Sequence, residues 1–269
     1  MVASIFKDKV VVITGASSGI GRELAYQLAE QGAWLSLAAR NGERLATVAG
    51  ECQARGGKAI AIVTDVSEQA QCAELIQRTV DHYDRIDMLV NNAGITMWAN
   101  FEDVSDISFY EQMMRVNYLG SVYCTHYALP FLKKTKGQII GISSLAGKNG
   151  IPKRSGYAAS KHAMVGFFDT LRIETAEHGI SVTMIYPDFV ATETHKRALG
   201  GDGKPIGKSP VREKEIMSAE RCAQLIIQAA ATRKRELIMT WRGKVGLWVK
   251  LIAPDLVDSI AKKAIIEGR

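Results

Sequence analysis

The sequence contains few of the residues that form disulfide frameworks or metal centres. Its four cysteines are scattered with no Cys-x-x-Cys spacing, which favours free thiols in a reducing compartment. The five histidines include no pair at metal-ligand spacing beside a cluster of carboxylates, so no metal site is expected. No linker rich in proline or glycine interrupts the chain before about residue 198, which favours a single domain over residues 1–269.

Long apolar runs are also missing. No stretch reaches the roughly 18 apolar residues that are needed to cross a bilayer, and residues 1–9 lack the apolar core of a signal peptide. We therefore expect a cytoplasmic protein. At 269 residues, with 47% hydrophobic and 23% charged residues, the chain is long enough to bury a sizeable core.

The positive charge is concentrated near the C-terminus. The formal net charge is +6, and residues 196–269 hold 16 Lys and Arg against 8 Asp and Glu. This excess fits an anionic substrate, an anionic lipid surface or an ordinary solvated face. Nucleic-acid binding is not expected, because the basic residues lack interleaved aromatic residues and no recognition motif accompanies them.

Short β-rich runs alternate with longer helical patterns through most of the chain. Near-continuously apolar strands separated by helices are typical of a parallel sheet that is covered on both faces. We therefore expect an α/β, doubly wound Rossmann fold of about seven strands, with ligands at the edge where the strands end. The predicted strands are residues 10–14, 35–39, 59–64, 88–90, 139–142, 182–186 and 237–240.

Two segments depart from this alternation. Residues 200–210 are rich in glycine and proline, which predicts a mobile loop within a lid-like segment of about residues 190–216 over the substrate. Residues 241–266 form an amphipathic extension, in which Val245, Trp248, Val249 and Ile252 recur at helical spacing. Such an extension lies on a membrane surface, closes a substrate pocket or packs in an oligomer, and the pattern leaves these alternatives open.

A glycine-rich turn follows the first predicted strand. The segment Thr14-Gly-Ala-Ser-Ser-Gly-Ile-Gly21 joins that strand to a helical pattern, which is the context of a pyrophosphate-binding turn. Free N–H groups at the start of the helix would then face the negative charge of a dinucleotide. The predicted contacts in this turn are Gly15, Ser17, Ser18, Gly19, Ile20 and Gly21.

The end of the second predicted strand indicates which dinucleotide is bound. Enzymes that select NAD(H) place a carboxylate there, which binds the ribose hydroxyls and would repel a 2'-phosphate. Here the chain reads Leu37-Ala-Ala-Arg-Asn41, with an arginine and no acid. A guanidinium matches the geometry of phosphate, so Arg40 predicts NADP(H) in preference to NAD(H), unless its side chain simply points into solvent.

A tyrosine and a lysine lie one helical turn apart in the second half of the chain. Tyr157 and Lys161 share a helix face, and Ser144 follows the predicted strand 139–142. A free phenol has a pKa near 10, so it acts as a base at neutral pH only beside a positive charge. Ser144 would hydrogen-bond the substrate oxygen. These residues predict general acid–base chemistry beside a bound dinucleotide.

Taken together, these motifs resemble the ordered motif set of the short-chain dehydrogenase/reductase family over roughly residues 8–195. The resemblance implies that Tyr157 exchanges a proton with the substrate while Ser144 holds the substrate oxygen. It also implies that Lys161 binds the nicotinamide ribose and favours phenolate, and that Asn117 holds a water linking Lys161 to solvent. The matching segments are Thr14–Gly21, Asp65-Val66, Asn91-Asn92-Ala93-Gly94, Asn117, Ser144, Tyr157-x-x-x-Lys161 and Pro187–Thr192.

The resemblance extends to the cofactor contacts and to the assembly. It implies that Asp65 and Val66 flank the adenine and that Asn92, Ala93 and Gly94 line the adenine ribose side. It also implies that Thr192 contacts the nicotinamide carboxamide and that Pro187 and Val190 bind the cofactor. One position departs, since the family usually has Pro-Gly where this chain has Pro187-Asp188. Asp188 would either contact a polar substrate group or satisfy the turn. A homodimer or homotetramer is expected from the family alone.

A weaker likeness to hydroxysteroid dehydrogenases and related membrane-associated reductases implies a lipophilic substrate and peripheral membrane contact through the C-terminal segment. The expected protein is an NADP(H)-dependent oxidoreductase that moves hydride between nicotinamide and a carbonyl or secondary alcohol. An epimerase or dehydratase of the related extended family and a dinucleotide-binding scaffold without turnover are the alternatives. The last residues, Ile266 to Arg269, spell a protease-linker sequence and carry no functional weight.

Overall fold

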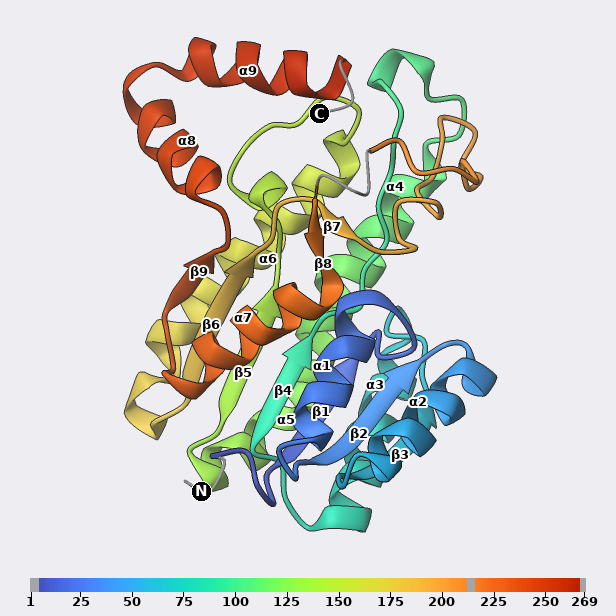
Figure 1. The fold of residues 1–269 in the computed structure, drawn as a ribbon, viewed down its shortest axis with the longest axis vertical. Helices are drawn as coiled ribbons and strands as arrows, with labels where there is room; N and C mark the ends of the chain where they lie inside the picture. The colour runs from blue at the N-terminus through green and yellow to red at the C-terminus, as the bar shows by residue number, and fades with distance from the viewer. Residues whose placement is uncertain (1–4, 212–215, 267–269) are drawn as a thin grey trace.

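The computed structural model describes residues 5–211 and 216–266, and its centre is a parallel sheet (Figure 1). Its seven strands lie in the order β3-β2-β1-β4-β5-β6-β9, and every neighbouring pair is parallel. This confirms the predicted doubly wound fold. The strands are β1 (Val10–Thr14), β2 (Trp34–Ala39), β3 (Lys58–Val63), β4 (Met88–Asn91), β5 (Gln138–Ile142), β6 (Ser181–Tyr186) and β9 (Glu236–Ile238).

The predicted strands coincide with those of the structure to within one or two residues. The central strands β1, β4 and β5 are buried at every residue, as their unbroken apolar sequences require when helices cover both faces. The largest error is at the end of the last strand. We predicted that it continues to Thr240, but β9 ends at Ile238 and Thr240 instead caps the next helix by accepting a hydrogen bond from the Gly243 amide.

Helices form a layer on each face of the sheet. The cluster on one face combines residues of α1 (Gly19–Ala29), α2 (Gly42–Ala54) and α7 (Ala219–Ala231). The cluster on the other face combines residues of α3 (Gln69–Tyr83), α5 (Gly120–Thr135) and α6 (Ser155–Glu174). Figure 1 shows α1 and α7 in front of the sheet, with α5 and α6 behind it.

The long helical stretch before β5 has an irregular middle. It runs through α4 (Ser108–Met113), a π-helical turn η2 (Met114–Leu119) and α5. Single π-helical turns inside α-helices are frequent at functional sites. Short 3₁₀ turns complete the described structure at η1 (Phe101–Asp103), η3 (Leu145–Gly147) and η4 (Ala176–His178).

The predicted lid-like segment is attached to the rest of the molecule at its base and near its middle. Two short parallel strands, β7 (Val190–Ala191) and β8 (Met217–Ser218), pair where the segment leaves and rejoins the fold. Leu199 exchanges backbone hydrogen bonds with the chain after β4, accepting from the Trp98 amide at 2.8 Å and donating to the Thr96 carbonyl at 2.9 Å. Residues 212–215 of the segment lie outside the described residues.

The C-terminal extension is two helices rather than one. Helix α8 (Trp241–Ile252) ends at Ala253, and α9 (Pro254–Ile266) begins at the following proline, because a residue before proline is driven out of the helical conformation. Both helices lie at the top of Figure 1, beyond the ends of the strands. Among the described residues, none of the helices is both long and apolar enough to span a bilayer. Residues 267–269 of the protease-linker motif lie outside the described residues.

Candidate active site

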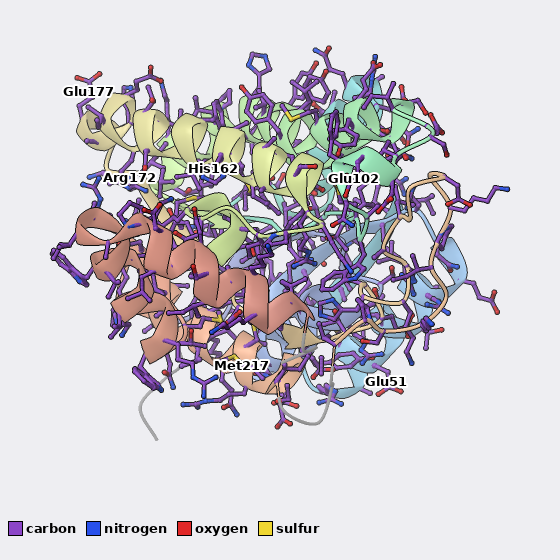
Figure 2. All side chains as sticks on the ribbon, turned by 90° about the horizontal axis from the view of Figure 1, so that it is seen from above. Glu51, Glu102, His162, Arg172, Glu177 and Met217 are labelled. Carbon is purple, nitrogen blue, oxygen red and sulfur yellow. The ribbon has the colours of Figure 1, made fainter. Side chains whose placement is uncertain are left out.

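A cavity of about 520 Å³ opens at the edge where the strands end. Figure 2 looks onto this end and shows the C-terminal helices on one side and the lid-like segment on the other. The predicted site residues Gly21 and Asn117 do not line the cavity. Those that do are Gly15, Ser17, Ser18, Gly19, Ile20, Arg40, Asp65, Val66, Asn92, Ala93, Gly94, Ser144, Tyr157, Lys161, Pro187, Val190 and Thr192.

The glycine-rich turn is fitted tightly between β1 and the end of β4. Gly15 has φ +66°, a conformation that favours glycine. A Cβ on Gly21 would lie 2.4 Å from the Gly15 carbonyl oxygen, so no side chain fits there. The Asn92 amide donates to the carbonyls of Thr14 and Gly15 at 2.9 and 3.2 Å. Gly21 therefore shapes the turn from behind, which is why it is absent from the cavity wall.

The start of α1 has amide groups that can receive an anion. Ser18 is the N-cap residue of α1, and its side chain makes no capping hydrogen bond. The first amides of a helix have no partner inside the helix and carry the positive end of its dipole. The first residues of α1, Gly19 and Ile20, line the cavity together with Ser17, so the residues present fit the pyrophosphate of a dinucleotide.

Arg40 follows β2 directly and lines the same cavity. Its side chain is 61% exposed, and its Nη1 lies 4.0 Å from the Asp65 carboxylate. Asp65 also accepts hydrogen bonds from the Ser67 amide and hydroxyl. No acid stands at the end of β2 itself. The guanidinium is therefore held loosely at the mouth of the cavity, where a phosphate can reach it.

Ser144, Tyr157 and Lys161 all line the cavity. Ser144 follows β5, and its hydroxyl accepts from the Ala146 amide at 3.2 Å, which fixes its position. Lys161 Nζ donates to the Ile142 carbonyl at 2.8 Å and lies 5.8 Å from the centre of the Tyr157 ring. Burial lowers the pKa of Lys161 to about 8, because the protein interior disfavours the charged ammonium.

Asn117 lies in the π-helical turn behind these residues and is fully buried. Its side chain accepts from the Ile95 amide at 2.8 Å and donates to the Ile95 carbonyl and the Ser160 hydroxyl. The Ser160 hydroxyl in turn donates to the Tyr157 carbonyl at 2.8 Å. Both amide hydrogens of Asn117 are thus used within the protein, and this side chain joins the segment after β4 to the helix that carries Tyr157.

Asp188, the departure from the usual Pro-Gly pair, lies in the wall of the cavity. Its carboxylate accepts from the Phe189 amide at 3.0 Å and lies 3.5 Å from the Thr240 hydroxyl at the start of α8. Burial raises the pKa of this carboxyl group. The short-range bond to Phe189 is the turn-satisfying role that the sequence suggested, and the contact with Thr240 links the cavity to α8.

The structure adds residues that the sequence analysis did not propose. Arg154 lines the cavity one helical turn before Tyr157, and that spacing is a signal that sequence reasoning had available. Several other additions adjoin predicted site residues in the sequence: Ala39, Asn41, Thr64, Ile95, Val116, Ser143 and Phe189. The rest are Thr96, Gln112, Ile142, Thr194, His195, Arg197, Leu199 and Pro205. Among the described residues, no group of three or more His, Cys, Asp or Glu side chains is arranged to hold a metal.

The fold and the residues at its carboxyl edge define a class, the Rossmann-fold oxidoreductases that bind NAD or NADP. The sequence model of the "short chain dehydrogenase" family matches residues 9–200. The chain belongs to this family, as its ordered motifs predicted. The match does not favour the epimerase or dehydratase alternative.

Curated relatives agree over nearly the whole chain. The "11-beta-hydroxysteroid dehydrogenase-like 4A" of Arabidopsis thaliana is 40% identical over 256 residues, which cover 95% of this chain and 84% of the relative. The "Dehydrogenase/reductase SDR family protein 7-like" of Dictyostelium discoideum is 37% identical over 266 residues, which cover 97% and 83%. The similarity therefore includes the C-terminal helices that follow the family match.

Solved structures show the same fold with either cofactor. An alcohol dehydrogenase from the archaeon Thermococcus sibiricus, complexed with 5-hydroxy-NADP, has a TM-score of 0.75 and 28% identity, covering 87% of this chain and 96% of its own. A short chain dehydrogenase/reductase from Burkholderia phymatum in complex with NAD has a TM-score of 0.82 and 25% identity, covering 93% and 95%. These neighbours support dinucleotide binding without choosing between NAD and NADP.

Proposed function

We propose that this protein is an NADP(H)-dependent oxidoreductase that interconverts a carbonyl compound and a secondary alcohol, with Tyr157 as the general acid and base. The observation that carries this proposal is a single cavity lined by Ser144, Tyr157, Lys161 and the glycine-rich turn. When bound, the nicotinamide supplies or accepts the hydride. The chain itself has to bind and orient the substrate and to handle one proton.

Each of the four predicted catalytic residues then has a separate task. The Ser144 hydroxyl, fixed by the Ala146 amide, holds the substrate oxygen and stabilises charge that develops on it. In the reducing direction the Tyr157 hydroxyl gives its proton to that oxygen, and in the oxidising direction the phenolate takes it back. Lys161 supplies a positive charge beside the ring and hydrogen bonds for the nicotinamide ribose. Asn117 fixes the position of α6 relative to the segment after β4 through its hydrogen bonds with Ser160 and Ile95.

A screen of ketones, aldehydes and alcohols, followed by NADPH absorbance, tests the proposal. Tyr157→Phe removes the exchangeable proton and keeps the ring, so turnover should fall by at least about a hundredfold while NADPH binding is retained. Unchanged NADPH oxidation in this variant would refute the proton-transfer role. Cofactor binding by wild type without turnover of any compound would favour the scaffold alternative.

The preference for NADP(H) is carried by Arg40 and by the absence of an acid at the end of β2. A guanidinium at this position would bind a 2'-phosphate, with Ser17 or Ser18 as further donors. Arg40→Asp should reverse the preference, because a carboxylate binds ribose hydroxyls and repels phosphate. An unchanged ratio of the kcat/KM values for NADPH and NADH would rule out Arg40 as the phosphate ligand.

We further propose a lipophilic substrate and peripheral contact with a membrane. The residues that line the cavity include the apolar side chains Val116, Phe189, Leu199 and Pro205, which suit an apolar part of a substrate. On the outside of α8 and α9, large apolar side chains are exposed, as in helices that lie on a bilayer surface. A relative is named as an 11-beta-hydroxysteroid dehydrogenase-like protein, which agrees with a lipophilic substrate class.

The remaining proposals concern assembly and location. We propose a single domain with a lid-like segment over the substrate, in a homodimer or homotetramer that works in the cytoplasm. Light scattering measures the oligomeric state, and a monomer at working concentration would overturn that proposal. Crystals with substrate bound would show whether the lid-like segment covers it.

A further inference from the structure

We propose that Arg154 is a positioning residue for the acid–base step, a second cation that stabilises the ionised form of Tyr157 across the face of its ring. Lys161 is the first cation in this arrangement. The inference rests on the proposed function, because it assigns a task to Arg154 within the reaction that Tyr157 performs.

The guanidinium of Arg154 lies against aromatic rings rather than against carboxylates. Its Cζ is 4.8 Å from the centre of the Tyr157 ring, 5.2 Å from that of Phe189 and 5.7 Å from that of Trp98. Its Nη2 donates to the Thr96 hydroxyl at 2.9 Å. These contacts hold the guanidinium over the ring of Tyr157. They are independent of the hydrogen bond to the Ile142 carbonyl that holds Lys161.

The charge on Arg154 is buried and has no ion pair. The residue is only 6% exposed, and within the described part of the chain it forms no salt bridge and its Nε has no hydrogen-bond partner. Burial lowers the pKa of its guanidinium, while the acidic groups of Tyr157 and Asp188 raise it. A buried cation without an ion pair is destabilising even where neutral groups contact it, so an interaction with a negative charge beside Arg154 would be stabilising.

Ionised Tyr157 would supply that interaction. A cation over an aromatic face is attracted by the negative charge of the ring face, and this attraction increases when the phenol becomes phenolate because the ring gains electron density. The guanidinium therefore stabilises phenolate more than phenol. During reduction the proton leaves Tyr157 for the substrate oxygen, and Arg154 lowers the energy of the charge that stays behind.

Other charged or titratable groups line the same cavity or pack near the ring of Tyr157, and they influence the size of the effect. Lys161 lies on the same helix, 5.8 Å from the ring centre. Asp188, on the loop after β6, interacts electrostatically with Arg154 and with Arg242 of α8. His195 of the lid-like segment lines the cavity. Tyr110 of α4 packs in the same apolar cluster as Tyr157.

The direct test is an ultraviolet titration of the phenolate without substrate. The absorbance of Tyr157 is isolated by subtracting the curve of Tyr157→Phe from that of wild type, and the same subtraction is made in the Arg154→Met background. Methionine keeps the length and apolar contacts of the arginine stem but removes the charge. We expect the Tyr157 midpoint to move to higher pH by about one unit, and an unmoved midpoint would overturn the proposal.

Two further variants separate charge from structure. Arg154→Lys keeps a cation over the ring and should restore the midpoint to within a fraction of a unit, whereas a purely structural role would leave Lys and Met equally displaced. Asp188→Asn removes the opposing charge and should move the midpoint to lower pH. This variant keeps the proposal testable if Arg154→Met does not fold, and a midpoint at or above the wild-type value would contradict it.

Steady-state kinetics then test whether the electrostatic effect on Tyr157 changes the pH dependence of catalysis. In the oxidising direction, the pH at which kcat/KM reaches half its maximum should rise in Arg154→Met by the same amount as the phenolate midpoint. An increase in KM with an unmoved pH profile would instead make Arg154 a substrate ligand and overturn the proposal. Because the titration needs no turnover, a failure of the proposed reaction would be visible separately as wild-type protein without activity.

Discussion

The glycine-rich turn and the C-terminal helices α8 and α9 differ in what determines their shape. At the turn, the Asn92 side chain donates to the backbone carbonyls of Thr14 and Gly15. The Thr14 hydroxyl accepts from the Asn92 backbone amide, and the packing leaves no room for a Cβ on Gly21. On α8, by contrast, Trp248 is 72% and Ile252 is 88% exposed. The turn is thus explained by packing within the chain, whereas the outer face of α8 has no packing within the described chain that explains its apolar residues.

The inner face of α8 does contact the rest of the molecule. A Cβ on Gly243 would lie 2.9 Å from the Leu145 side chain, and Leu145 follows Ser144 directly. Lys250 Nζ donates to the Lys148 carbonyl at 2.7 Å, and Lys148 pairs with Glu236 at 2.8 Å. Helix α8 is therefore fixed against the loop that carries Ser144, and only its outer face is open.

The first prediction tests how tightly the turn is packed. Gly21→Ala should weaken NADPH binding by at least about a hundredfold and lower the free energy of unfolding by about 2–3 kcal/mol, because the new methyl would overlap the Gly15 carbonyl. Calorimetric titration and denaturant unfolding measure the two effects. Gly50→Ala on α2 is the control, since a Cβ there meets nothing within 4 Å. Equal binding by both variants would refute the close packing.

The second prediction concerns the buried ammonium of Lys161. Its pKa lies near 8 in the folded protein against 10.5 ordinarily, so between these values the unfolded chain binds more protons and stability contributed by this residue rises with pH. Below pH 8 the ammonium is mostly charged in the folded protein, so the full free-energy cost of burying it is present. The free energy of unfolding of Lys161→Met minus that of wild type should therefore fall by roughly 3 kcal/mol from pH 7.5 to 10.5.

Denaturant unfolding at a series of pH values measures this difference. Lys133→Met, on the exposed end of α5, is the control and should give a curve parallel to that of wild type. A constant difference between Lys161→Met and wild type over the whole interval would mean that the ammonium is not destabilised by burial.

The third prediction tests the attachment of α8 to the Ser144 loop. Gly243→Ala should displace Leu145, lowering stability by about 1 kcal/mol and kcat/KM several-fold. Gly246→Ala, one turn further along α8, has nothing within 4 Å of its new Cβ and should stabilise the helix by about 0.5–1 kcal/mol. Indistinguishable activities would show that the position of α8 does not influence the active-site loop.

The last prediction concerns the outer face of α8 and has the smallest expected effect. Trp248→Ser should weaken co-sedimentation with anionic vesicles about fivefold, which corresponds to about 1 kcal/mol of lost apolar burial. Ile173→Ser, which removes an apolar side chain that is 77% exposed on α6, is the control and should pellet like wild type. If Trp248→Ser pellets equally well, the outer face of α8 is not the membrane contact.

The sequence was sufficient to predict the sheet and about half of the cavity wall, because both depend on local patterns. An apolar run such as Val10–Thr14 is a buried strand wherever helices cover it, and the spacing of Tyr157 and Lys161 places them on one helix face. The resemblance to a family then related these motifs to one another. Gly21 and Asn117 are the exceptions, since they shape the cavity from behind.

The remaining features depend on contacts between distant segments. The surroundings of Arg154 combine Trp98, Tyr157 and Phe189, and no spacing in the sequence indicates that these rings meet. The amphipathic pattern of residues 241–266 predicted helical structure correctly, but it indicated one helix and gave neither the break at Ala253 nor the direction of the apolar face. Periodicity identifies a stripe of apolar residues, whereas its orientation depends on what the helix packs against.

The pairing of β7 with β8 has a consequence for how this protein can change. The pairing holds the two ends of residues 192–216 next to each other, so the loop begins and ends at one fixed position in the fold. Lengthening a loop whose ends are already fixed adds little entropic penalty, and the sheet beneath would not be disturbed. Loops of different length from other proteins should therefore be tolerated between β7 and β8, which makes this segment a suitable place to redesign the substrate range.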